Sequence, residues 1–211
     1  MNARLLYVMD PMCSWCWGFA PVFDALAAQA QDAGLDVQLL VGGLRPGTAQ
    51  ALDGATRDYL LSHWHAVAER TGQAFGFAGA LPDGFVYDTE PACRALVTVR
   101  SLAPEQVRPL LQAIQRAFYL EGRDVTRAAV LVELAEAVGV SRQAFAEAFD
   151  SAAQRAATQA DFARVANFGI AGFPTLLAER HGQLALLTNG YQPLERLAPL
   201  LGRWLERRAH G

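Results

Sequence analysis

The sequence predicts an α/β protein in which one small sheet is divided by a large block of helices. Two short apolar runs near the N-terminus, at 4–9 and 35–41, indicate buried strands on either side of a helical pattern. A strand, a helix and a second strand in that order form a parallel βαβ unit with a right-handed crossover. Strand patterns return only at 175–179 and 184–188, before a final helical pattern. The expected plan is therefore βαβ, a helical insertion, and then ββα.

The helices are predicted from apolar side chains spaced three or four residues apart. The first helix stops at Gly34, because glycine is typical just past a helix end. The segment 50–168 has helical spacing nearly throughout, and its Gly-, Phe- and Pro-rich stretch at 75–88 is expected to be a loop. Residues 180–183 are predicted to be the turn of a hairpin between the last two strands.

Length and composition fit one globular unit with an inserted subdomain. The chain has 211 residues, of which 52% are hydrophobic and 18% charged, with a formal net charge of -3. No Lys/Arg cluster could neutralise a phosphate track, so a nucleic-acid partner is not expected. Arg207 and Arg208 are interpreted as a solvated helix end. We assign 1–48 and 169–211 to the sheet-containing domain and 49–168 to the inserted helical subdomain.

The N-terminal sequence predicts a cytoplasmic protein. The apolar run that follows Arg4 is far too short for a signal core or a membrane span, so no membrane partner is expected. The three cysteines, Cys13, Cys16 and Cys93, are too few for a disulfide framework. In a reducing compartment, a close cysteine pair is more often catalytic or metal-binding than structural.

Cys13 and Cys16 lie where the first predicted strand meets the first predicted helix. Cys13 would sit at the helix start, where unpaired N–H groups and the helix dipole favour a thiolate. Cys16, one turn further, would be more shielded and would resolve a mixed disulfide. The alternative is a zinc half-site, which needs two more ligands. Cys93 stands alone, and His63 and His65 point to different helix faces, so no metal is expected.

Several motifs carry a resemblance to a known family. They are Asp10-Pro11-Met12-Cys13-Ser14-Trp15-Cys16-Trp17-Gly18-Phe19, Gly42-Gly43-Leu44-Arg45-Pro46-Gly47, Tyr87-Asp88-Thr89-Glu90-Pro91-Ala92-Cys93 and Gly172-Phe173-Pro174-Thr175. With the order of elements, they resemble the DsbA-like branch of the thioredoxin superfamily, and within it the cytoplasmic FrnE-like group of protein-disulfide isomerases. The resemblance covers essentially the whole chain. It implies a thioredoxin fold with a large all-helical insertion.

The resemblance also implies roles for individual residues. Cys13 would be the attacking thiolate and Cys16 the resolving thiol, and together they would form a redox-active disulfide. Pro174 would be the family's cis-proline, which exposes the backbone of Phe173 to a substrate strand; its own sequence context also allows a trans turn proline. Secreted DsbA proteins carry a histidine between the cysteines, where this chain has Ser14 and a tryptophan. We therefore expect a less oxidising couple, suited to a cytosolic reductase or isomerase.

Four further residues each allow two interpretations. Trp15 could line an apolar groove for substrates or pack into the core. Asp10 could accept the Cys16 proton as a general base, or could be a turn carboxylate at the strand end. Arg45 could face an anionic substrate or a glutathione carboxylate, or could lie on the surface. Cys93 could be activated at a helix start, but a small buried apolar residue is the simpler interpretation.

The predicted function is thiol–disulfide exchange on protein or peptide thiols and disulfides, without a bound cofactor. One alternative is a glutathione-dependent isomerase or transferase of the kappa or hydroxychromene-carboxylate isomerase type. Those enzymes carry a serine where Cys13 stands, which argues against that class but leaves glutathione as a possible co-substrate. The other alternative is a non-enzymatic protease adaptor on the same fold. The sequence does not predict the oligomeric state.

Overall fold

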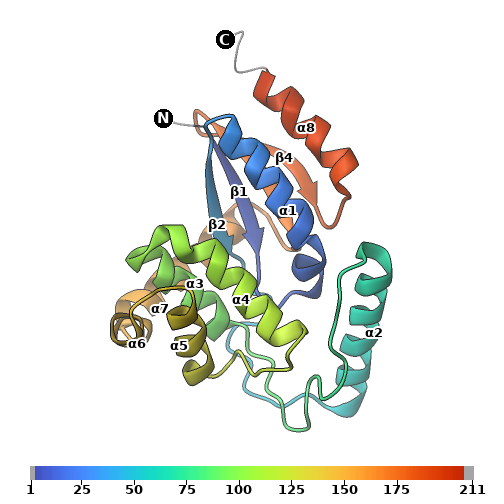
Figure 1. Cartoon of the computed structure of the whole chain (residues 1–211), viewed down its shortest axis with the longest axis vertical. Helices are drawn as coiled ribbons and strands as arrows, with labels where there is room; N and C mark the ends of the chain where they lie inside the picture. The colour runs from blue at the N-terminus through green and yellow to red at the C-terminus, as the bar shows by residue number, and fades with distance from the viewer. Residues whose placement is uncertain (1–2, 207–211) are drawn as a thin grey trace.

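A computed structural model describes residues 3–206, which fold around one four-stranded sheet (Figure 1). The strands are β1 (Arg4–Met9), β2 (Asp36–Val41), β3 (Thr175–Arg180) and β4 (Gln183–Asn189), in the order β2-β1-β3-β4. β1 and β2 are parallel, whereas β3 is antiparallel to both β1 and β4. The N-terminal βαβ and the C-terminal ββα units therefore join along β1 and β3, and the predicted fold class is confirmed. Arg207 and Arg208 lie outside the described residues.

Six of the α-helices in the described chain come between β2 and β3. The helices are α1 (Ser14–Asp32), α2 (Gly54–Thr71), α3 (Glu90–Leu102), α4 (Val107–Tyr119), α5 (Ala128–Ala137), α6 (Arg142–Phe149), α7 (Ala152–Asn167) and α8 (Leu194–Glu206), with a 3-10 turn η1 (Pro104–Gln106). In Figure 1, α1 crosses one face of the sheet, α3 to α7 gather at one end, and α2 stands apart near the start of α1. None of the described helices is long and apolar enough to cross a membrane.

The sheet is covered on both faces, and alternate residues of β1 serve the two layers. Leu5 and Tyr7 belong to the large core that also holds the apolar side of α1. The Tyr7 ring stacks on Phe23 of α1 with the ring centroids 4.0 Å apart. Val8 points to the other face, where it packs with Val165 of α7. The end of β1, which leads into the cysteine motif, is thus fixed from both sides.

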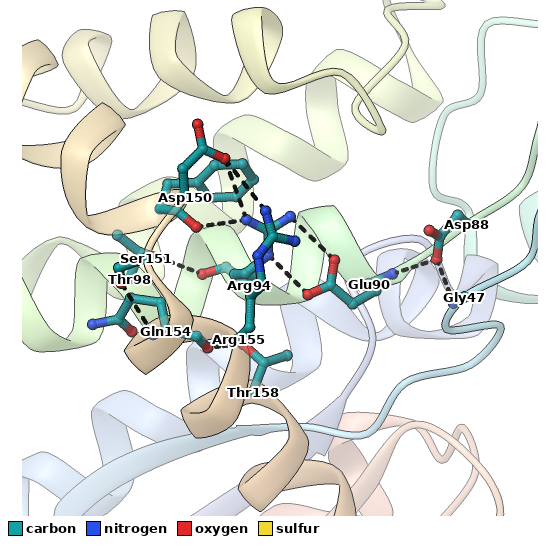
Figure 2. Close-up of polar contacts among 11 residues, drawn as sticks. Gly47, Asp88, Glu90, Arg94, Thr98, Asp150, Ser151, Gln154, Arg155 and Thr158 are labelled. Atoms are coloured by element: carbon teal, nitrogen blue, oxygen red, sulfur yellow. Dashed lines mark hydrogen bonds and ion pairs between the residues drawn. The ribbon is translucent and has the colours of Figure 1, made fainter.

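A buried arginine in α3 ties together the helices of the insertion (Figure 2). The Arg94 Nε donates to Glu90 Oε1 at 2.8 Å, and an Nη donates to the backbone carbonyl of Phe149 at 2.5 Å. The guanidinium also lies 3.9 Å from the Phe149 ring centroid and 3.8 Å from Asp150. This contact holds the first turn of α3 against the junction between α6 and α7.

The edge of the sheet formed by β2 is covered by an ion pair from the insertion. Arg100 of α3 and Asp161 of α7 form two hydrogen bonds, of 2.7 and 3.0 Å. Arg100 also donates to the carbonyl of Leu39, and Asp161 accepts from the N–H of Val41. Because β2 has no further strand beside it, these contacts pair edge groups that would otherwise be open to another chain.

Candidate active site

The two close cysteines lie at the junction of β1 and α1, as the sequence predicts. Cys13 is the N-cap residue of α1, with an extended backbone (φ -86°, ψ 117°), and its carbonyl accepts the N–H groups of Cys16 and Trp17. Cys13 keeps a small exposed fraction of 6%, whereas Cys16 has none. All three cysteines of the chain are free thiols. The geometry therefore presents Cys13 to the outside and leaves Cys16 behind it.

The segment before β3 closes over Cys13. The Phe173–Pro174 peptide bond is cis, as the resemblance implies. The Cys13 thiol donates to the carbonyl oxygen of Phe173, with Sγ and O 3.7 Å apart. The Phe173 ring lies directly on Gly42, where an added Cβ would stand 2.1 Å from the ring. Only glycine at position 42 leaves this room, so the loop after β2 helps to place the backbone beside Cys13.

Asp10 lies beneath the cysteine motif and is fully buried. Its Oδ1 accepts the N–H of Met12 at 2.8 Å, and its Oδ2 accepts the N–H of Leu44 at 2.6 Å. The same Oδ2 lies 3.4 Å from the Sγ of Cys93. Burial raises the pKa of the Asp10 carboxyl, while the Leu44 and Met12 hydrogen bonds act in the opposite direction. Asp10 is therefore a turn carboxylate that also lies within the thiol cluster.

Cys16 is held as a neutral thiol in the reduced protein. Burial raises the pKa of its thiol well above the usual range, and the neighbouring Cys13 adds to the effect, while a backbone hydrogen bond at Asp10 acts in the opposite direction. A protonated thiol is a poor nucleophile, because the thiolate is the reacting form. An attack by Cys16 on a mixed disulfide therefore needs a nearby group that accepts its proton.

A cavity of about 680 Å³ reaches the neighbourhood of Cys13 through Phe173, whose carbonyl contacts the Cys13 thiol. It is lined by Trp15, Ala66, Glu69, Arg70, Phe173, Gly190 and Tyr191. Aromatic contacts shape it, because the ring of Tyr191 lies 6.1 Å from Trp15 and 5.6 Å from the guanidinium of Arg70. Trp15 thus lies on the groove that the sequence allowed for it, while Ser14 is half-buried at the first position of α1.

The segment before α3 holds two loops of the site, a role that sequence reasoning missed. The Tyr87 hydroxyl donates to the carbonyl of Met12. Thr89 Oγ1 accepts the N–H of Arg45 at 3.1 Å, and the Arg45 side chain lies over the Tyr87 ring at 5.4 Å. Cys93 follows in the first turn of α3. The motif at 87–93 was visible in the sequence, but nothing in it indicated which loops these side chains reach.

Metal ligands are not grouped in the described part of the chain. Among residues 3–206, no set of three or more His, Cys, Asp or Glu side chains is arranged to hold an ion. The cluster around Cys13 and Cys16 consists of thiols, one carboxylate and phenols. This set of groups suits proton and thiol chemistry.

Comparisons with known proteins agree with this geometry. Residues 4–202 match the family model of the DsbA-like thioredoxin domain. A structure from Nitrosomonas europaea, described provisionally as a protein disulfide isomerase, is 43% identical, with a TM-score of 0.90 and full coverage of both chains. No curated protein gives a significant match to the sequence.

Two further structures extend the comparison. The cytosolic disulfide reductase DsbM from Pseudomonas aeruginosa is 36% identical, with a TM-score of 0.78, over 95% of this chain and 98% of that one. A structure of DsbM with GSH is 34% identical over the same shares. A 2-hydroxychromene-2-carboxylate isomerase is 17% identical with a TM-score of 0.66, which shows a shared fold alone.

Proposed function

Because the chain belongs to the DsbA-like thioredoxin domain family, whose members are thiol–disulfide oxidoreductases, we propose that it exchanges disulfides through Cys13 and Cys16. The observation that carries this proposal is the position of Cys13. It caps the start of α1 and contacts the Phe173 carbonyl next to the cis Pro174. A helix start favours the thiolate, and the adjacent backbone gives an extended substrate a place to dock.

The exchange runs in two steps. The Cys13 thiolate attacks one sulfur of a substrate disulfide, and the other sulfur leaves as a thiolate that takes a proton from solvent. Asp10 then accepts the Cys16 proton, and the Cys16 thiolate attacks Cys13 Sγ. The second substrate sulfur leaves as a thiolate, so the substrate gains two electrons and the protein ends with a Cys13–Cys16 disulfide. Two small thiols, such as two molecules of glutathione, restore the dithiol and are themselves oxidised to a disulfide.

The direction of net exchange is reduction or isomerisation in the cytoplasm. Ser14 and Trp15 stand between the cysteines and carry no positive charge, so they stabilise the Cys13 thiolate less than a histidinium would. A less stabilised Cys13 thiolate corresponds to a less oxidising Cys13–Cys16 pair. The similarity to a cytosolic disulfide reductase, at 36% identity, supports the same direction.

Glutathione is the small thiol that best fits the cavity beside Cys13. Arg70 could pair with one of its carboxylates and Glu69 with its ammonium group, while Trp15 and Tyr191 cover its apolar stem. The related DsbM structure with GSH supports this assignment. A glutathione transferase or isomerase would use the same cavity without a second thiol, so the role of Cys16 separates the two functions.

Insulin reduction with glutathione as electron donor tests the proposal. The parent protein should accelerate the precipitation of the insulin chains, and Cys13→Ala should abolish the acceleration. Cys16→Ala should accumulate a mixed disulfide on Cys13, because the resolving thiol is absent. The double variant is the control for non-specific trapping. Equal activity in the parent protein and Cys13→Ala would overturn the proposal and favour an adaptor role.

A further inference from the structure

We infer that Cys93 is a positioning residue for this exchange, acting through its hydrogen bond to Asp10. The inference rests on the proposed function, because Asp10 is the proton acceptor of Cys16 there. Cys93 lies in the first turn of α3, in the helical insertion, whereas Asp10 directly follows β1. Both side chains are fully buried, and Sγ and Oδ2 are 3.4 Å apart across 83 positions of sequence.

The contact is a hydrogen bond from the Cys93 thiol to the Asp10 carboxylate, which apolar packing does not explain. A carboxylate oxygen offers two lone pairs, and Asp10 Oδ2 already accepts the N–H of Leu44. The Cys93 thiol is a donor that can fill the second position while the carboxylate is ionised. A buried carboxylate depends on such donors, since burial alone favours its neutral form. The Cys93 thiol therefore acts on the ionisation of Asp10.

The other ionisable groups of the described chain that lie around Asp10 make no direct hydrogen bond to its carboxylate. The ionisable side chains that interact with Asp10 are those of Cys16, Tyr87, Cys93 and Tyr119. The Thr89 hydroxyl is a further donor, Arg45 faces Tyr87, and Glu90 faces Cys93. The Tyr87 hydroxyl is committed to the Met12 carbonyl. Of the thiols and phenols around Asp10, Cys93 is the one with a direct hydrogen bond to the carboxylate.

The consequence for the reaction follows from the proton balance. When Cys93 donates to Asp10, it stabilises the ionised carboxylate, which is the form that takes the Cys16 proton. Without the donor, a larger fraction of Asp10 is protonated at a given pH, and fewer molecules can resolve the mixed disulfide. The acidic limb of the resolution rate then moves to higher pH, while the attack by Cys13 is unchanged.

A matched pair of substitutions separates this role from packing. Cys93→Ala removes the donor, whereas Cys93→Ser keeps one of similar size. The release of substrate from a Cys13-linked mixed disulfide is measured in single turnover across pH, and Asp10 is titrated by its carboxyl ¹³C shift. Cys93→Ala should move both midpoints up by about half a pH unit, about threefold in rate on the acidic limb. Cys93→Ser should retain the parent midpoints.

Two controls sharpen the result. Val99→Ala shortens another buried side chain of α3 and should leave both midpoints in place. In an Asp10→Asn background, Cys93→Ala should have no further effect on the pH profile. Unchanged midpoints in Cys93→Ala, or equal shifts in Cys93→Ala and Cys93→Ser, would overturn the inference. The carboxyl titration needs no disulfide exchange, so failure of the insulin assay overturns the proposed function separately.

Discussion

Replacing Arg94 by methionine should destabilise the protein strongly. The Arg94 side chain is 6% exposed and its partner Glu90 is 16% exposed, so the substitution leaves a shielded carboxylate without its cation. The backbone carbonyl of Phe149 also loses its donor. Removing one partner of a buried pair costs about 3–5 kcal/mol. For a chain of this length, that corresponds to a fall of about 6–20 °C in Tm.

The assay is urea unfolding together with a thermal scan, and an exposed ion pair provides the control. Arg116 and Glu121 lie 3.0 Å apart, but their side chains are 67% and 41% exposed. Arg116→Met should therefore cost less than about 1 kcal/mol. Adding Glu90→Gln to Arg94→Met should recover part of the loss, because the orphaned charge is removed. A loss for Arg94→Met no larger than that for Arg116→Met would refute the reasoning.

Three further results are expected. Gly42→Ala should slow insulin reduction about tenfold or more, since its Cβ would lie 2.1 Å from the Phe173 ring and displace the loop. Gly54→Ala, whose Cβ would meet open space, should leave the rate unchanged. Equal rates for the two variants would contradict the steric argument. Burial raises the pKa of Asp10 above its ordinary 3.8, so the unfolded chain ionises first as pH rises. In urea unfolding, the stability of the parent relative to Asp10→Asn should therefore be constant below about 3.8 and fall between that pH and the raised folded pKa; a rise there would contradict the assigned direction. Asp161→Ala should cost about 3 kcal/mol in urea unfolding, because losing the 10% exposed carboxylate leaves the Arg100 guanidinium without its counter-charge and the N–H of Val41 without an acceptor. A loss below about 1 kcal/mol would argue against the edge-capping role.

The parts of the fold that depend on local chemistry were predictable. The first strand, the helix that starts at the cysteine motif and the second strand follow from hydrophobic spacing and length. The hairpin turn at His181 and Gly182 was also predictable. Both residues have a positive φ, which a two-residue turn requires and which glycine adopts readily. The cis bond before Pro174 followed from the family resemblance, since its local sequence also fits a trans turn.

The contacts that complete the site were not predictable in the same way. Hydrophobic spacing places Cys93 on the buried side of a helix, but it does not say that a carboxylate 83 positions earlier lies opposite. Arg94, the next residue along, is a charged residue on a buried stretch of helix, and besides Glu90 of the same helix it contacts the Phe149 carbonyl of another helix. The fit between Gly42 and the Phe173 ring likewise joins two loops that are distant in sequence. These features depend on tertiary contacts, which a single sequence does not encode as spacing.

The helical insertion is therefore part of the site as well as a cover for the sheet. Tyr87 holds the loop that leads into the cysteine motif, and Thr89 holds the loop after β2. The site has two sides. The side that faces substrate is built by α1, α2 and the segment before β3. The side where Asp10 accepts the proton is closed by Cys93 of α3. Because Arg94 anchors the same first turn of α3 that carries Cys93, a loosened anchor should disturb the proton step before it disturbs the groove. Arg94→Met, assayed at a temperature where it remains folded, should accordingly slow resolution of the mixed disulfide more than its formation, and an equal effect on both steps would place α3 outside the chemistry.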